Sequence, residues 1–180
     1  MLGVLVISGE YGTGMIRSTL TAVPRRLLVP LSKLAVFGIL VLATMTVAAF
    51  AAFFVGQSLL GPHGVSLSAP HALRAVLGVG LYLTVVAALA LGIGFALRST
   101  AGGIATTFGL LLVLPAIGHV LPSSWQRHTL PYLPSNAGGA LYDLHPDPGT
   151  LSPWVGSTVM CTWAVAALVI GAVVLQRRDA

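Results

Sequence analysis

Four long runs without a charged side chain dominate the chain, and they cover residues 34–73, 75–97, 99–126 and 148–176. A helix needs about 20 mainly apolar residues to cross the hydrocarbon core of a bilayer. Trimmed to their most apolar parts, the runs predict four membrane-spanning helices: Leu34–Leu60, Ala75–Leu97, Gly103–Leu121 and Trp154–Leu175. Polarity does not alternate along them, as it would in the strands of a membrane barrel. The pattern therefore predicts an all-α, polytopic membrane protein with one transmembrane domain over residues 1–180.

Composition strengthens this interpretation. Charged residues make up 7% of the 180 positions and apolar residues 56%, whereas a typical soluble domain is roughly 25% charged. So few charges cannot cover the surface of a soluble domain, and the excess of basic over acidic residues does not indicate nucleic acid. The single cysteine, Cys161, excludes an intrachain disulfide.

The basic residues are distributed unevenly between the two sides that four crossings would define. Seven fall on one side: Arg17, Arg25, Arg26, Lys33, Arg98, Arg177 and Arg178. Only Arg74 and Arg127 fall on the other. Because cytoplasmic loops are enriched in Lys and Arg, we expect both ends of the chain to face the cytoplasm from the cell membrane.

Glycine pairs in the second predicted span allow two interpretations. The spacings Gly78-x-Gly80 and Gly92-x-Gly94 would let neighbouring backbones approach closely. Glycine is also simply frequent in membrane helices, so the pairs alone do not decide the matter.

The residues before the first span divide into two parts. Met1–Ile7 is apolar but too short to cross a membrane, and it resembles the cytoplasmic end of a helix whose earlier part is absent. Over residues 8–24, Ile16, Leu20 and Val23 share one helical face, and Pro24 ends the pattern. This segment predicts an amphipathic helix on the cytoplasmic surface, either as an interfacial anchor or as a docking helix for a soluble protein.

The segment Pro122–Pro153 is expected to be an extracytoplasmic loop rich in proline and aromatic residues. Within it, Tyr132–Ala140 predicts a short re-entrant or surface helix with Ser135 or Asn136 as N-cap. Asp143, His145 and Asp147 alternate in a way that could hold a metal, but the intervening prolines favour an extended loop, and no metal site is predicted.

Catalytic chemistry is not indicated. No nucleophile elbow, metalloprotease motif or phosphate-binding loop occurs, so we expect neither an enzyme nor a cofactor, with ATP hydrolysis on a partner only. The polar residues in or near the spans suit helix–helix or back-bonding hydrogen bonds, or a path for an amphipathic substrate; they are Gln57, Thr44, Thr46, Thr84, Thr106 and Thr107.

The run ISGEYGTGMIRSTL at Ile7–Leu20 resembles a motif of permease subunits of type-2 ABC exporters, particularly actinobacterial ones. In that family the motif forms the cytoplasmic coupling helix, which contacts a separate ATPase. The segments Tyr132–Ala140 and Leu151–Trp154, and the ending Arg177–Asp179, are similar to the family's last outer loop and cytoplasmic tail. The resemblance covers essentially the whole chain.

Several expectations follow from this resemblance. The contact with the ATPase falls on six residues of the motif: Glu10, Tyr11, Met15, Ile16, Arg17 and Leu20. Expected partners are an ABC ATPase subunit, a second copy or related permease in a dimer, and the lipid bilayer, but no nucleic acid. Family members have six membrane helices, two of them before the coupling segment, so the resemblance implies an N-terminally truncated permease that retains the C-terminal two-thirds.

Two classes of function remain open at this stage. The chain is expected to be a permease subunit that forms part of an export path driven by a separate ATPase. The alternative is a non-transporting remnant or a membrane scaffold whose surface helix anchors a partner. No residue chooses among drugs, lipids, peptides and polysaccharides as the substrate.

Overall fold

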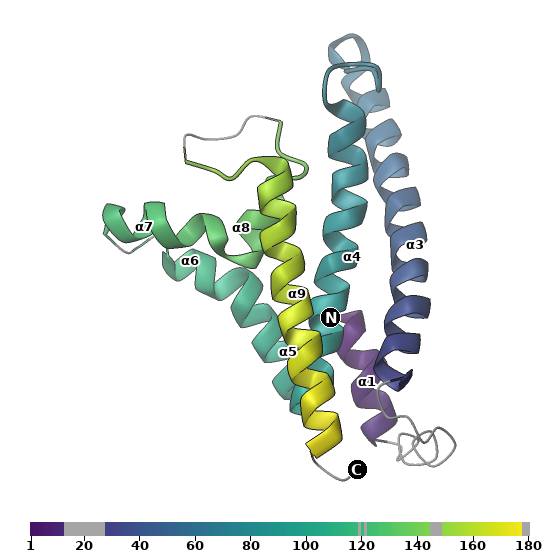
Figure 1. Cartoon of the computed structure of the whole chain (residues 1–180). Helices are drawn as coiled ribbons and strands as arrows, with labels where there is room; N and C mark the ends of the chain where they lie inside the picture. The colour runs from purple at the N-terminus through teal and green to yellow at the C-terminus, as the bar shows by residue number, and fades with distance from the viewer. Residues whose placement is uncertain (13–27, 119, 121, 145–148, 178–180) are drawn as a thin grey trace.

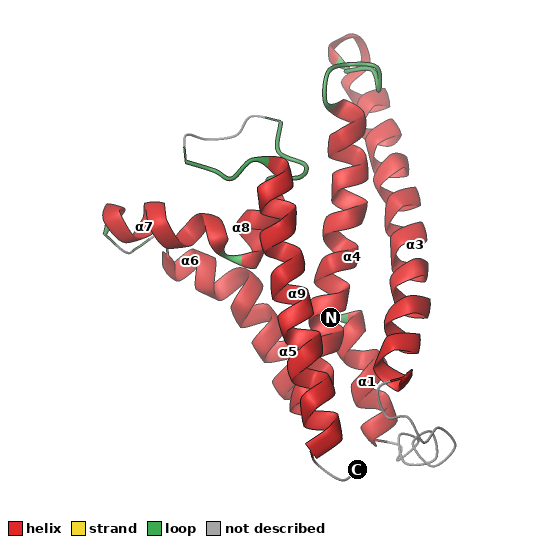
Figure 2. Ribbon diagram, viewed as in Figure 1, coloured by secondary structure: helices red, strands yellow, loops and turns green. Residues whose placement is uncertain are grey.

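The described part of the chain is helical, with turns between the helices and no strand (Figure 2). The computed structural model describes residues 1–12, 28–118, 120, 122–144 and 149–177. Its longer helices are α1 (Leu2–Gly12), α3 (Leu28–Leu60), α4 (Ala72–Leu97) and α9 (Pro153–Arg177). The shorter elements are η1 (Gly61–His63), α5 (Thr100–Phe108), η2 (Gly109–Val113), α6 (Leu114–Gly118), α7 (Ser123–Thr129), η3 (Leu130–Tyr132) and α8 (Pro134–Gly139).

The four predicted spans are confirmed as helices long and apolar enough to cross a membrane. They extend over Pro30–Leu60, Ala72–Leu97, Thr100–Gly118 and Pro153–Arg177. The first, second and fourth begin one to four residues before the predicted starts. The third consists of α5, η2 and α6 and starts three residues early, because Ser99 caps it by accepting a hydrogen bond from Gly102 N–H.

A π-helical turn interrupts the third span. It covers Gly109–Val113, and the N–H of Leu114 donates to the carbonyl of Gly109, five residues back. Pro115 follows directly, has no N–H, and would crowd the carbonyl of Leu111 in a regular helix. The widened turn therefore accommodates the proline, and such turns are frequent at functional sites.

The N-terminal half of α4, called its outer half below, packs closely on two neighbours through glycine. A Cβ on Gly78 would lie 2.8 Å from the carbonyl oxygen of Leu141, just after α8. A Cβ on Gly80 would lie 2.6 Å from Thr46 Oγ1 and 3.2 Å from Thr46 Cα, on α3. Both glycines are buried, so the close-approach interpretation of this pair is confirmed.

The inner half of α4 uses its second glycine pair in the same way. A Cβ on Gly92 would lie 2.6 Å from the carbonyl carbon of Ala167 and from Leu168 N, on α9. Gly94 faces α1, where its Cβ would lie 3.3 Å from Val4 Cα. Each of the four glycines thus contacts a different part of the chain, and α4 is therefore the central helix of the bundle.

The inner half also holds a small core. Ile7 of α1, Leu91 and Phe95 of α4, and Leu175 of α9 are almost fully buried and form one cluster. Gly171 of α9 contributes to the same contact, since its Cβ would lie 2.7 Å from Gly92 O. Three helices therefore meet at this level of the bundle.

The elements place the basic residues of the described part at two ends. Helix α3 begins, and α4 and α9 finish, at the same end of the molecule (Figure 1), which puts Lys33, Arg98 and Arg177 there. Arg74 stands in the first turn of α4 at the opposite end, here called the outer end. This arrangement agrees with the predicted number of crossings, whereas the assignment of the shared end to the cytoplasm stays a prediction.

Threonines within the spans bond back to their own helices. The hydroxyl groups of Thr44, Thr84 and Thr107 donate to carbonyls four residues earlier, at 2.7 to 2.8 Å. This is the ordinary back-bonding role expected of polar residues in membrane helices.

Helix α1 joins the two N-terminal parts of the sequence. It includes Leu2–Ile7 of the apolar N-terminal segment and continues without a break through Ser8 to Gly12. Val4, Ile7 and Ser8 are buried against the bundle. Residues 13–24 of the predicted amphipathic helix lie outside the described residues.

Candidate functional site

The residues predicted to contact an ATPase are only partly placed. Glu10 and Tyr11 lie in the last turn of α1, at the end of the bundle shared with Arg98. Met15, Ile16, Arg17 and Leu20 lie outside the described residues. The predicted docking contact therefore stays a prediction, and the site that the structure builds lies elsewhere.

The segment after the third span turns back into the bundle. It consists of α7, η3 and α8, and Figure 1 shows α8 behind α9 rather than above it. Trp163 Nε1 donates to the carbonyl of Tyr132 at 3.0 Å. Trp163 stands ten positions after Pro153, so this contact lies about 15 Å along α9 from its outer end. The predicted short helix within Tyr132–Ala140 is confirmed. It lies beside α9 instead of over its end, and we call it the re-entrant helix for this reason, while its depth in a bilayer stays a prediction.

The predicted N-cap of this helix was wrong. Leu133 occupies the cap position and no side chain caps the helix, while Ser135 and Asn136 lie inside it. Pro134 at the first position favours the start, because its ring already has the helical φ and its missing N–H would have no partner within the helix anyway. The Asn136 side chain bonds instead to the carbonyl of Leu130, at 3.0 Å.

Small residues wedge α8 between α4 and α9. Gly138 of α8 lies so close to the ring of Tyr82 on α4 that a Cβ would overlap it. On the other side, Gly156 of α9 lies against the carbonyl of Ala137. These contacts fix the depth and the direction of α8.

The end of the re-entrant segment is tied to the outer end of α4. Arg74 Nη2 donates to the carbonyl of Asp143 at 3.2 Å. The rings of Tyr82 and Tyr142 meet edge to face, with centroids 5.5 Å apart. Such aromatic pairs stabilise a contact by about 0.5–1.5 kcal/mol beyond the burial of their area.

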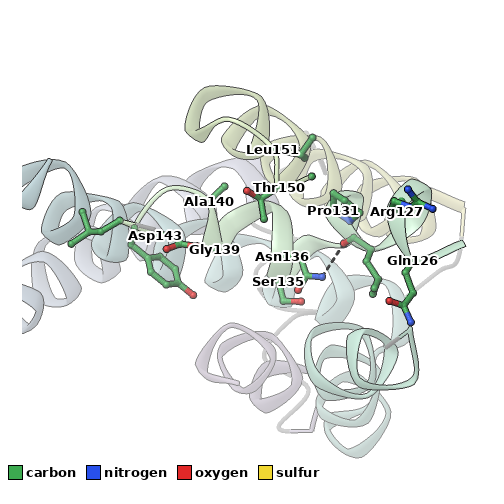
Figure 3. A pocket seen from close by; sticks show the side chains of 14 residues that line it. Gln126, Arg127, Pro131, Ser135, Asn136, Gly139, Ala140, Asp143, Thr150 and Leu151 are labelled. Atoms are coloured by element: carbon green, nitrogen blue, oxygen red, sulfur yellow. Dashed lines mark hydrogen bonds between the residues drawn. The ribbon is translucent and has the colours of Figure 1, made fainter. Parts of the chain in front are cut away.

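A cleft of about 770 Å³ opens on the outer side of this segment (Figure 3). We call it the outer cleft. Its polar lining includes Gln126, Arg127, Asn136, Asp143 and Thr150, and Figure 3 shows these side chains coming from α7, α8 and the loop before α9.

A second cavity, of about 650 Å³, lies on the other side of α8. We call it the inner cavity. Its apolar lining comes from the start of α1 and from the third span, including the π-helical turn: Met1, Phe108, Leu111, Leu112, Pro115 and Ala116. Its polar lining comes from α4, α5, α8 and the turn after α8: Tyr82, Thr107, Ser135, Asn136 and Tyr142.

Three residues line both spaces. They are Ser135, Asn136 and Tyr142. The hydroxyl oxygen of Ser135 is buried and has no hydrogen-bond partner. The re-entrant helix therefore separates the outer cleft, which Arg127 and Asp143 line, from the inner cavity, which they do not line, with an unsatisfied hydroxyl at the boundary.

Sequence reasoning singled out Ser135 and Asn136 only as caps and did not assign Tyr82 or Tyr142 to a site. The available signal was polar residues in a proline-bounded segment beside a span that contains Pro115. In the described residues no group of three His, Cys, Asp and Glu lies close enough together to hold a metal. Of the three residues weighed above as metal ligands, Asp143 belongs to the described part of the chain, while His145 and Asp147 lie outside it.

Within the described residues, fold and site together define an all-helical protein with four helices able to span a membrane and a re-entrant helix between two cavities. No family model, curated protein or solved structure matches this chain.

Proposed function

We propose that the chain is a permease subunit of an ATP-driven exporter and forms part of its path through the membrane. The observation that carries this proposal is the re-entrant helix α8, which has a space on each face and shares Ser135, Asn136 and Tyr142 between them. Irregular backbone at membrane depth is tolerated where it is buried in protein or lines a cavity. A scaffold that only anchors a partner needs no such arrangement.

Helix α1 offers a route by which a cytoplasmic partner could act on this path. Val4 packs against Gly94 of α4 and against Gly103 of α5. The same helix carries Glu10 and Tyr11 in its last turn and leads into the segment that resembles a coupling helix. A partner that moves this end would thus change the angle between α4 and the third span, two walls of the inner cavity.

The chain has no phosphate-binding loop, so energy for export is assigned to a separate ATPase. Glu10 and Arg17 are seven residues apart and would lie two turns apart on one helical face. The charge of Glu10 binds a groove on the ATPase, while Met15, Ile16 and Leu20 supply apolar anchors.

The test is co-purification of the cognate ATPase with the permease carrying Glu10→Gln. We expect weaker association, by about 1–3 kcal/mol, as for a lost charge-assisted hydrogen bond. Asp143→Asn, the same change at the outer end of the bundle, is the matched control and leaves recovery unchanged. Membrane insertion is measured for both variants.

Unchanged ATPase recovery with Glu10→Gln would contradict the docking role and favour a surface anchor. Failure of the wild-type chain to retain any ATPase would favour a scaffold or remnant over a permease.

A further inference from the structure

The third span consists of two arms joined by the π-helical turn. The inner arm is α5 (Thr100–Phe108) and the outer arm is α6 (Leu114–Gly118), with Gly109–Val113 between them. A regular α-helix is stiff because each carbonyl accepts a hydrogen bond from the N–H four residues later. The hydrogen bonds of the turn therefore decide how firmly the two arms are joined.

The backbone hydrogen bonds of the turn are incomplete at Leu110. In an α-helix its carbonyl would accept from the N–H of Leu114, but that N–H donates to Gly109. In a π-helix it would accept from residue 115, but Pro115 has no N–H. For the same reason Pro115 cannot donate to Leu111. Two consecutive carbonyls thus lack their α-helical donors, and the turn resists bending less than the arms on either side.

The composition of the turn adds to this weakness. Gly109 stands at its start, and glycine within a helix is less favourable than alanine by about 1 kcal/mol. Sharp kinks in helices occur mainly at prolines, at glycines and at π-helical turns. All three features coincide within Gly109–Pro115.

The two arms are held by different parts of the chain. On the inner arm, a Cβ on Gly103 would lie 2.6 Å from Val4 Cγ1 of α1. On the outer arm, a Cβ on Gly118 would overlap the side chain of Leu130, whose carbonyl accepts from Asn136 Nδ2 of α8. A displacement of α1 therefore acts on the inner arm, whereas the re-entrant segment holds the outer arm.

The turn itself rests on the centre of the bundle. Leu110 and Leu111 pack against a cluster formed by Leu89 and Ile93 of α4 and Ala164 of α9. This contact keeps the turn in place while the angle between the arms changes, as a hinge between two packed parts requires.

We propose that the third span is a hinged helix, in which the inner arm swings about Gly109–Pro115 together with α1 while the outer arm stays with the re-entrant helix. This inference rests on the proposed function and deepens it, because it names the element through which a cytoplasmic partner acts on the path. Ala101 lies about 12 Å from Gly109 along the helix. A bend of about 20°, the size of a sharp kink, would displace Ala101 by about 4 Å.

The experiment measures distances between two spin labels by pulsed electron paramagnetic resonance, on the purified chain in lipid nanodiscs and in a Cys161→Ser background. A label at Ala166→Cys of α9 is the common reference. Its partner is Ala101→Cys on the inner arm or Ile117→Cys on the outer arm, and all three side chains are exposed. We expect the distance distribution of the inner pair to be broader than that of the outer pair by about 4 Å, the displacement of a hinged arm.

Two variants stiffen the hinge. Pro115→Ala supplies the missing N–H, and we expect it to remove most of the excess width of the inner pair. Pro153→Ala is the matched control and leaves both pairs unchanged, because Pro153 is the first residue of α9, where an N–H has no partner within the helix. Gly109→Ala stiffens the same turn without changing the proline, and we expect it also to narrow the inner pair. Gly56→Ala on α3 is its control, since at both glycines an added Cβ would meet no described atom within 4 Å.

Equal widths for the inner and outer pairs would overturn the inference, because the third span would then move as one rod. Excess width that survives in either stiffened variant would also overturn it, since the turn would then not be the pivot. Thermal unfolding establishes that each variant is folded, and Gly109→Ala decides the matter if Pro115→Ala does not fold. The experiment contains no ATPase, so a rigid third span would leave the docking test unaffected, and a failed docking test would leave the hinge in place.

Discussion

Helices α3 and α4 are equally apolar, yet α3 lies at the surface of the bundle and α4 at its centre. In the most apolar stretch of α4, 44% of the residues are buried, against 6% in α3. Leu59 and Ile39 of α3 are 83% and 69% exposed, as expected for side chains that face lipid. Hydropathy therefore identifies a span but does not tell which span is central.

Glycine placement accounts for the difference. A Cβ added to Gly38 or Gly56 of α3 would meet nothing within 4 Å. The corresponding atoms on Gly78, Gly80 and Gly92 of α4 would all collide with a neighbour. In α3 glycine only follows the composition of a membrane helix, whereas in α4 it determines how close other elements come.

The largest effect is expected from Gly92→Leu. Its Cβ would overlap the backbone at Ala167 and Leu168, which cannot move without separating α9 from α4. We expect a loss of at least about 1–3 kcal/mol in the free energy of unfolding, the usual range for overpacking, measured by thermal unfolding in detergent micelles. Gly38→Leu on α3 is the matched control and changes stability by less than about 0.5 kcal/mol. Equal losses at the two sites would contradict the assignment of α4 as the central helix.

Gly138→Ala tests how closely α8 packs against the outer half of α4. The added methyl group would overlap the ring of Tyr82, while at the adjacent Gly139 the nearest contact would be an ordinary 3.6 Å from Tyr142 Oη. We expect Gly138→Ala to displace α8 and to destabilise the protein by about 1–3 kcal/mol, and Gly139→Ala to have little effect. A disulfide crosslink between α8 and α9, formed in the wild type and reduced in Gly138→Ala, reports the displacement. Crosslinking that both variants leave intact would show that Tyr82 can yield.

The smallest effect is expected from Gly80→Ala, where α4 meets α3. The first atom in contact would be Thr46 Oγ1, at 2.6 Å. Thr46 lies on α3, which has few contacts with elements other than α4 and can therefore shift outward. We expect a loss of about 1 kcal/mol, which Thr46→Ala largely restores in the double variant. A double-mutant cycle measures this coupling, and additive losses would contradict a direct contact.

The sequence predicted the number of spans and their bounds to within a few residues, because long charge-free runs are the direct requirement of a bilayer. It also indicated that glycine at positions 78, 80, 92 and 94 could admit neighbours. It could not say which part of the chain contacts which glycine. The four contacts come from the turn after α8 and from α3, α9 and α1, and tertiary packing determines the position of each.

The site was less accessible to sequence reasoning. A short helix near Ser135 was predicted, but its insertion between α4 and α9 depends on Gly138 and Gly156, which have no periodic pattern linking them. The unsatisfied hydroxyl of Ser135 is a consequence of packing, whereas the π-helical turn before Pro115 follows from the proline itself. Only the structure brings Tyr82, Ser135 and Tyr142 together, because they lie on separate elements.

The most direct test of the path is the reaction of a single cysteine at Ser135, in a Cys161→Ser background, with a membrane-impermeant maleimide in sealed vesicles. Thr150→Cys marks the outer cleft and Ala166→Cys the lipid-facing surface. If α8 separates two connected spaces, Ser135→Cys reacts from the outer side more slowly than Thr150→Cys and clearly faster than Ala166→Cys, and ATP turnover by the partner ATPase raises its rate. A rate no greater than that of Ala166→Cys, with or without ATP, would contradict a path at α8.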